Sequence, residues 1–115
     1  MAQLINKTQD RVLSDKLVKA SSLFQRTKGL LGKSHLDENE MLWILRCNSI
    51  HTFFMNFAID CVFLNKQMFV CSIKTDIKPW RLVLPIFKAT SVIEMGAGQA
   101  LRLDIHLGDQ LHVGH

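Results

Sequence analysis

Residues 57–73 carry the pattern that decides the fold, and they read Phe-Ala-Ile-Asp-Cys-Val-Phe-Leu-Asn-Lys-Gln-Met-Phe-Val-Cys-Ser-Ile. The first arm, 57–64, is apolar on both faces apart from Asp60, which is typical of a strand inside a sheet. Residues 65–67 form a short polar turn, and 68–73 return as a second apolar run. The stretch therefore predicts a β-hairpin whose first strand lies in the interior of a sheet.

Short apolar runs recur on both sides of this hairpin, separated by turn residues. They predict strands at 4–7, 11–13, 17–20, 41–45, 91–95, 101–103 and 111–113, with turns at 14–16 and 96–98. Many short strands joined by Gly- and Asp-bearing turns are typical of barrels and sandwiches. We therefore expect a mainly β fold, a compact barrel or a jelly-roll-like sandwich of short strands.

Two segments depart from the β pattern. Ser21 or Ser22 can cap a helix and Gly32 can end it, so one short helix is expected near residues 22–31. Pro79 and Pro85 place the segment from Asp76 to Lys88 in an irregular stretch or at a sheet edge.

Chain length and amino-acid composition indicate a single globular domain. The 115 residues match one domain, 1–115, and 48% hydrophobic with 21% charged residues is ordinary globular composition. The apolar runs are far shorter than the roughly 20 residues that cross a bilayer, and the N-terminus lacks the apolar core of a secretory signal. We expect neither a membrane partner nor export.

The cysteines and the net charge indicate the cellular compartment and the class of partner. Cys47, Cys61 and Cys71 are odd in number and form no Cys-x-x-Cys pair, which favours buried thiols in a reducing, cytoplasmic compartment over a reactive thiol. The net charge of +4 is spread along the chain, and Tyr is absent. These features argue against nucleic acid and favour a solvated surface, with a phosphate-bearing ligand as the alternative.

One stretch, 49–60, sets polar side chains among apolar ones. His51, Thr52, Asn56 and Asp60 must be hydrogen-bonded in a core or line a pocket, because an unpaired buried polar group costs roughly 1–3 kcal/mol. Asp60 interrupts an apolar strand, so it needs a cation or several N–H donors to stay ionised. A structural network and a functional site are both open interpretations.

The second constellation is Lys78-Pro79-Trp80-Arg81. A Trp beside an Arg on a Pro-stiffened loop can stack a ring and hold an anion. The alternative is that Trp80 closes the end of a barrel while Arg81 lies at the surface.

Other titratable residues give weaker patterns. Glu94 can act with Asp60 as an acid/base couple, although their spacing does not require it. His106 and His112 lie near the C-terminus without metal-ligand spacing, and we find no cofactor motif. We expect no metal and no cofactor.

These elements occur together in an order that resembles a known family. The motifs are Arg26-x-x-Gly-Leu-Leu-Gly, Ile50-His-Thr-Phe-Phe-Met, Ile59-Asp-Cys-Val-Phe-Leu, Lys78-Pro-Trp-Arg, Val92-Ile-Glu-Met-Gly-Ala-Gly and Leu107-Gly-Asp. Over about residues 17–113 the chain is similar to the small prokaryotic family called domain of unknown function 192. The resemblance implies a compact, mostly β domain with a short helix near its start, and no established activity.

The resemblance also singles out positions in this chain. They are Arg26, Gly29, His51, Met55, Asp60, Trp80, Arg81, Glu94, Gly98, Gly108 and Asp109. Asn56 stands where the family commonly has Arg or Lys, which puts in doubt an anion site that would rely on a cation there. Met95-Gly96 stands where Leu-Pro is usual.

Three functions remain open. The leading one is a binding module, with a small polar or anionic ligand held at one end of a β-barrel by Arg26, His51, Asp60, Trp80 and Arg81. The second is an enzyme, a hydrolase or isomerase with His51 as general base and Asp60 orienting it. The third is an accessory domain that docks on a partner protein through a strand edge or the segment 74–88.

Overall fold

The computed structural model describes residues 2–20 and 33–114. The elements are β1 (Ala2–Asn6), β2 (Arg11–Ala20), β3 (Glu40–Leu45), β4 (Ile50–His51), β5 (Ile59–Leu64), β6 (Val70–Ile77), β7 (Leu82–Val83), β8 (Ser91–Gly96), α2 (Gln99–Arg102) and β9 (Leu111–Gly114). The fold is therefore mainly β, as the sequence predicts.

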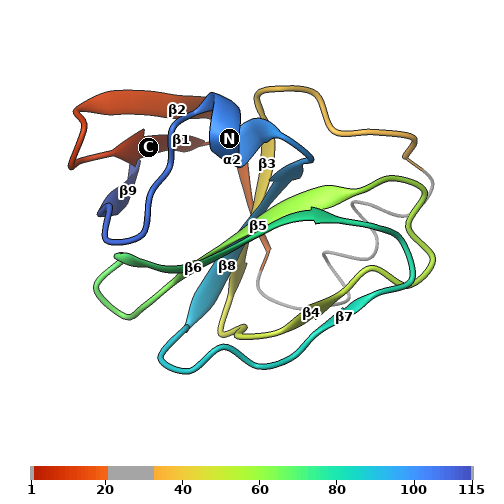
Figure 1. Ribbon diagram of the computed structural model, residues 1–115. Coiled ribbons are helices and arrows are strands. Elements are labelled where there is room, and N and C mark those ends of the chain that lie inside the picture. The colour runs from red at the N-terminus through yellow and green to blue at the C-terminus, as the bar shows by residue number, and fades with distance from the viewer. Residues whose placement is uncertain (1, 21–32, 115) are drawn as a thin grey trace.

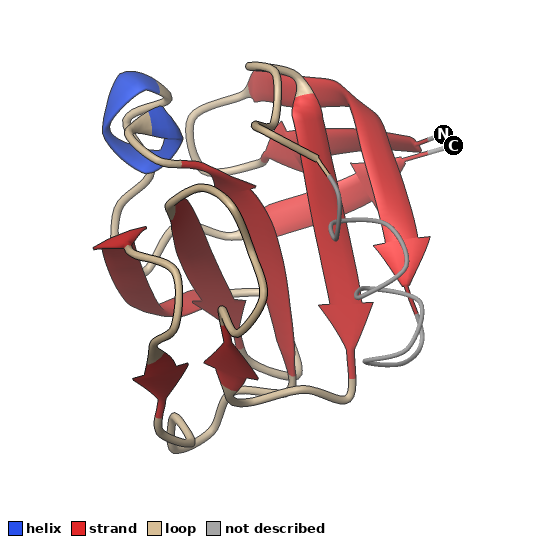
Figure 2. Ribbon diagram, turned by 90° about the vertical axis from the view of Figure 1, so that its right-hand side faces the viewer, coloured by secondary structure: helices blue, strands red, loops and turns tan. Residues whose placement is uncertain are grey.

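Seven strands form one sheet in the order β6-β5-β8-β3-β2-β1-β9, and β4 pairs with β7 in a separate two-stranded ribbon. Neighbours in the large sheet are antiparallel except β2 and β3, which are parallel. The sheet curls so that the start of β6 reaches the turn before β9, where the Val70 N–H donates to the Asp109 carbonyl oxygen at 2.8 Å. The result is a curled half-barrel, with the ribbon at one end of the molecule and α2 at the other (Figures 1 and 2).

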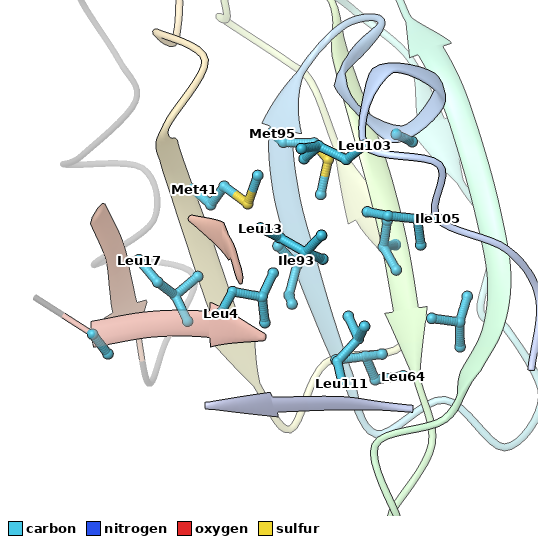
Figure 3. Close-up of a cluster of buried hydrophobic side chains, with 14 residues drawn as sticks. Leu4, Leu13, Leu17, Met41, Leu64, Ile93, Met95, Leu103, Ile105 and Leu111 are labelled. Atoms are coloured by element: carbon cyan, nitrogen blue, oxygen red, sulfur yellow. The ribbon is translucent and has the colours of Figure 1, made fainter. Parts of the chain in front are cut away.

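Each face of the large sheet carries its own hydrophobic core. The first core fills the inside of the curl, where Leu4, Ile93 and Leu111 point toward one another (Figure 3). The second lies on the opposite face and includes Ile50 and Val83, one from each strand of the ribbon. The ribbon therefore covers the second core with its inner face.

The central hairpin is confirmed as β5 and β6, and every residue of β5 is buried. Val62 and Leu64 of β5 pack in the first core and Ile59, Cys61 and Phe63 in the second, so both faces of the strand meet a core, which explains its continuous apolar run. The expected strand edge around the two prolines is also present, as the two-residue β7.

Two local expectations are wrong. Residues 101–103 do not form a strand, since Gly98 at φ 91° turns the chain into α2 and Ala100 packs in the first core. Residues 14–16 do not form a turn but lie within β2, where the Ser14 hydroxyl accepts the Lys16 N–H at 3.0 Å. The expected helix near 22–31 lies outside the described residues.

Candidate functional site

Asp60, buried in β5, acts as a clamp between three segments. Its carboxylate accepts backbone N–H groups from Asp76 at 2.8 Å and from Gly98 and Ala100 at 3.0 Å each. The Gly98 and Ala100 bonds satisfy free donors at the start of α2, whose own N-cap residue is a glycine without a side-chain acceptor. The Asp76 N–H lies at a β-bulge, where β6 has one residue more than β5, and the Asp60 carboxylate gives this N–H a hydrogen-bond acceptor. The expected set of N–H donors is thus present, and it serves the scaffold.

Beside this clamp the surface is hollowed. An open depression of about 510 Å³ is lined by Asp60, Thr75, Asp76, Ala97, Gly98 and Leu101. Both Asp60 oxygens are already held by backbone N–H groups. The depression therefore offers a ligand little beyond the exposed Asp76, which is itself paired with Lys78 at 2.8 Å.

Glu94 is fully buried in β8 on the other face of the sheet. In the strand register Glu94 lies opposite Cys61 of the second core, whereas Asp60 lies opposite Met95 of the first. Directly paired residues share a face, so the two carboxylates point to opposite sides of the sheet. The structure does not bring the expected acid/base couple together.

His51 lies at the end of β4, and its partner in the ribbon is Leu82. Its ring stacks on Phe53 with centroids 4.9 Å apart and an interplanar angle of 24°. Among the described residues, the donors to Asp60 are the backbone N–H groups of Asp76, Gly98 and Ala100, and His51 is not one of them. The structure therefore shows no shared hydrogen bond for the expected His51–Asp60 catalytic pair.

Aromatic rings gather around His51 into what we call the aromatic platform: His51, Phe53, Phe54 and Trp80. Phe53 and Trp80 have centroids 5.9 Å apart, and Phe54 meets Trp80 edge-on at 4.7 Å. Phe54 is 65% and Trp80 57% exposed to solvent. The platform thus presents ring faces and edges outward, from two loops that follow β4 and β6.

Thr52, which is fully buried, holds these two loops together. Its hydroxyl donates to the Lys78 carbonyl oxygen at 2.6 Å and accepts the Arg81 N–H at 2.9 Å. Its backbone N–H donates to the Arg81 carbonyl oxygen and its own carbonyl accepts the Trp80 N–H, both at 2.9 Å. A single residue, through its side chain and its backbone, therefore fixes the loop that carries Trp80.

The backbone at the platform is strained. Phe54 has φ 66° and Trp80 has φ 64°, in the left-handed region that bulky residues avoid. Each such residue costs about 1–2 kcal/mol and persists only where its surroundings impose it. The two most exposed rings of the platform are the two on left-handed backbone, a conformation that Met68 and five other described non-glycine residues share.

The platform lies in segments whose charges are all basic. Residues 46–59 and 77–93 contain Arg46, Lys78, Arg81 and Lys88 but no Asp or Glu. Lys78 pairs with Asp76, and within residues 2–20 and 33–114 the Arg81 guanidinium makes only long contacts, 3.4 and 3.5 Å, to the carbonyl oxygens of its own loop. Arg81 is exposed and so offers a cation at the edge of the platform.

The sequence-predicted site residues thus separate. His51, Trp80 and Arg81 come together at the β4–β7 end, Asp60 and Glu94 lie in the interior of the sheet, and Arg26 falls outside the described residues. Asn56, where the family pattern suggested a cation, donates to the Lys33 carbonyl oxygen at 3.2 Å.

Sequence reasoning missed the roles of Thr52, Phe53 and Phe54. The two phenylalanines looked like core residues within an apolar run. One signal was available, since the two segments that form this end contain aromatic and basic residues and no acidic ones.

Three further features bear on function: the cysteine thiols, possible metal ligands and possible membrane-spanning helices. Burial raises the pKa of the Cys71 thiol, which keeps it protonated at neutral pH, and Cys61 is buried in β5. Across residues 2–20 and 33–114, no three His, Cys, Asp or Glu side chains gather as a metal site would require. The same residues include no helix long and apolar enough to cross a membrane.

Comparison with known proteins extends this picture. A Thermococcus sibiricus protein named UPF0127 is 34% identical over 113 residues, which cover 94% of this chain and 72% of the relative. A Pyrococcus horikoshii protein of the same name is 30% identical, with 94% and 96% of the two chains covered.

Two solved structures share the fold. A protein of unknown function from Novosphingobium aromaticivorans superposes with a TM-score of 0.82 at 22% identity, covering 97% of this chain and 84% of that one. A Sinorhizobium meliloti protein, named as a proposed transcription regulator, gives 0.80 at 19% identity, with 97% and 91% covered. Identities this low show a common fold alone.

The family assignment rests on the sequence itself. The family model for domain of unknown function 192, described as uncharacterized ACR, matches residues 4–113. This match spans the half-barrel from β1 to β9 and includes both loops of the aromatic platform. The chain belongs to the domain of unknown function 192 family.

Proposed function

We propose that this protein is a binding module, and that its site is the aromatic platform together with Arg81. The ligand is anionic and carries an apolar group. This refines the leading interpretation of the sequence: the binding end of the half-barrel keeps His51, Trp80 and Arg81, while Asp60 belongs to the scaffold.

The observation that carries the proposal is the strained, exposed pair of rings. Phe54 and Trp80 are held in left-handed backbone conformations on the surface, where burial gives no compensating gain. Contiguous exposed apolar side chains on a small domain mark interaction sites. One buried residue, Thr52, donates two hydrogen bonds to the loop and accepts two from it, and these bonds fix the loop in this conformation.

The chemistry of the platform supports an anionic ligand with a flat apolar part. Ring faces stack on planar groups or on apolar carbons, and a guanidinium pairs with carboxylate, sulfonate or phosphate oxygens. With no Asp or Glu in the flanking segments, an approaching anion meets little repulsion.

An NMR titration with three soluble probes tests the proposal. Naphthalene-2-sulfonate carries ring and charge, naphthalene-2-methanol the ring alone, and methanesulfonate the charge alone. The chain has two tryptophans, so the indole N–H signal of Trp80 reports the platform and that of Trp43, half-buried on β3, is the internal reference.

We expect naphthalene-2-sulfonate to shift the Trp80 signal in a saturable way and to leave Trp43 in place. The neutral ring should bind about tenfold more weakly, and Arg81→Gln should remove that difference, because a charge-assisted hydrogen bond contributes about 1.5–3 kcal/mol. Equal shifts of both indole signals, or no saturation with any probe, would reject the proposal.

A further inference from the structure

The aromatic platform continues into a longer apolar face. Leu82 and Leu84 are 61% and 70% exposed, and Phe87 farther along is 85% exposed. Val83 and Ile86, which lie between them, pack on the second core. The segment 80–87 therefore turns one set of apolar side chains inward and another set, of the same character, outward.

Within the described part of the chain, this outer face is exposed to solvent. A two-stranded ribbon that packs one face on a core normally exposes polar groups on the other. Here the outward residues of the ribbon and its flanks are Trp80, Leu82, Leu84 and Phe87, next to the rings of Phe53 and Phe54. An exposed apolar area of this composition is covered by something when the protein acts.

The charges around the face indicate what covers it. Arg46, Lys78, Arg81 and Lys88 belong to the two segments that carry the face, residues 46–59 and 77–93, which contain no Asp or Glu. The exposed Asp76 just before the second segment pairs with Lys78 at 2.8 Å. Lys88 has its ammonium 5.7 Å from the centroid of the Phe87 ring, so a cation lies directly beside an exposed apolar group. Long cationic side chains beside Trp, Phe and Leu are the composition of surfaces that lie in the headgroup region of a membrane.

We infer that this face docks on an anionic phospholipid bilayer, with the platform and the Leu82, Leu84 and Phe87 side chains entering the headgroup boundary. The inference rests on the proposed function and names the source of its ligand: the anion is a lipid headgroup and the apolar group is the start of the acyl chain. Such docking is peripheral and needs no spanning segment, but it departs from the sequence-based expectation of no membrane partner.

The aliphatic residues decide between lipid and nucleic acid. A single-stranded nucleic acid would also use aromatic rings and cations, because bases stack on rings and phosphates pair with Lys and Arg. Leu82 and Leu84 offer no ring to stack on, yet they form the middle of the exposed face. Hydrocarbon at the acyl boundary matches them, and bases do not.

Sedimentation with lipid vesicles tests the inference. The full chain is mixed with vesicles of phosphatidylcholine alone or with about one-third phosphatidylglycerol, a content that gives the surface a negative potential. The altered variant is Leu82→Ser with Leu84→Ser. The matched control is Leu101→Ser with Leu107→Ser, which removes two exposed leucines away from the ribbon.

We expect binding to anionic vesicles to exceed binding to neutral ones by at least about tenfold, and to weaken as salt is raised. The Leu82/Leu84 variant should lose about tenfold in affinity, and the Leu101/Leu107 control should match the wild type, with both folded by circular dichroism. Equal affinity for neutral and anionic vesicles, or equal losses in the two variants, overturns the inference.

Two further outcomes separate the inference from the proposed function. If naphthalene-2-sulfonate still shifts the Trp80 signal while no vesicle is bound, membrane docking is wrong and the binding module stands. If neither the probe nor the vesicles bind, both fail. Binding of an oligouridylate instead of vesicles would assign the face to nucleic acid and reject the lipid.

Discussion

The two ends of this half-barrel differ in which kind of side chain is out of its usual environment. Near α2, a charged side chain, Asp60, is buried, and its oxygens accept three backbone N–H groups that would otherwise lack partners. At the β4–β7 end, apolar rings are exposed on a backbone held in a strained conformation. The first arrangement lowers the free energy of the fold and the second raises it.

This difference separates scaffold from site. A buried polar group whose bonds all go to the backbone is explained by folding alone. Exposed Phe54 and Trp80 are not explained by folding, since their strain and their contact with water both oppose it. The same physical argument places Asp60 in the scaffold and underlies our proposal that the aromatic platform is the binding site.

The largest expected effect is on the scaffold side. Asp60→Ala leaves three N–H donors near the start of α2 and in β6 without their acceptor. At roughly 1–3 kcal/mol for each lost partner, the free energy of unfolding should fall by about 3 kcal/mol or more in urea denaturation. Asp76→Asn, which keeps its backbone N–H and loses only an exposed ion pair, should change it by less than about 1 kcal/mol. Equal stability of the two variants would mean that Asp60 is not a clamp.

The next largest effect is expected at Thr52, where a substitution should change both stability and binding. Thr52→Val keeps the shape but removes the hydroxyl, so the Lys78 carbonyl and the Arg81 N–H lose a partner. Urea denaturation should show a loss of about 1–3 kcal/mol, and the affinity for naphthalene-2-sulfonate should fall as the loop loosens. Thr52→Ser, which retains the hydroxyl, should keep most of both. Unchanged affinity in the valine variant would show that Thr52 does not position the platform.

A smaller effect tests the strain itself. Phe54→Gly and Phe54→Ala both remove the ring, but only alanine retains a Cβ at φ 66°. In thermal or urea unfolding the glycine variant should therefore be more stable than the alanine variant by about 1 kcal/mol, the reverse of the usual order. If alanine proves the more stable, the platform is not strained and the contrast between the two ends weakens.

The smallest effect comes from a surface ion pair that belongs to neither region. The pKa of Glu40 is lowered, chiefly by the hydrogen bond from the Lys33 ammonium at 2.8 Å. A lowered folded-state pKa gives stability above the unfolded-state pKa, and this stability is lost as pH falls through the folded-state pKa. Because both side chains are partly exposed, Lys33→Met should lower stability at neutral pH by no more than about 0.5 kcal/mol.

Unfolding measured at neutral and at acid pH checks this value. The difference between Lys33→Met and the wild type should vanish at acid pH, where Glu40 is protonated. Lys66→Met, in the polar turn of the hairpin, is the control. A difference that persists unchanged in acid would exclude the ion pair as its cause.

Much of the fold could be predicted from the sequence. The apolar run 59–64 marks an interior strand because both faces of β5 meet a core. The helix at 99–102 was missed, since its apolar residues are too few to show a helical period and its start depends on Asp60, distant in sequence. The turn predicted at 14–16 was wrong because the Ser14 hydroxyl accepts a hydrogen bond from the Lys16 N–H within β2, which allows a polar residue to lie inside the strand.

The candidate site could be predicted only in part. The segment Lys78-Pro79-Trp80-Arg81 could be identified as a candidate site from its composition. His51 could be identified because it is a polar residue in an apolar stretch. Nothing local indicates that Phe53 and Phe54 face water, because that depends on how Thr52 joins two loops far apart in the chain. The faces of Asp60 and Glu94 likewise follow from strand register, which the chain sets only on folding.

The most direct test of the central claim measures the dissociation constant of naphthalene-2-sulfonate and the free energy of unfolding together, for wild type, Asp60→Asn and Trp80→Asn. Asparagine tolerates the left-handed conformation at position 80, so that variant removes the ring without adding strain. The account predicts that Asp60→Asn lowers stability and leaves the affinity of the folded protein unchanged, while Trp80→Asn keeps stability within about 1 kcal/mol and weakens binding about tenfold or more. The reverse pattern, with binding lost at Asp60 and stability lost at Trp80, would contradict it.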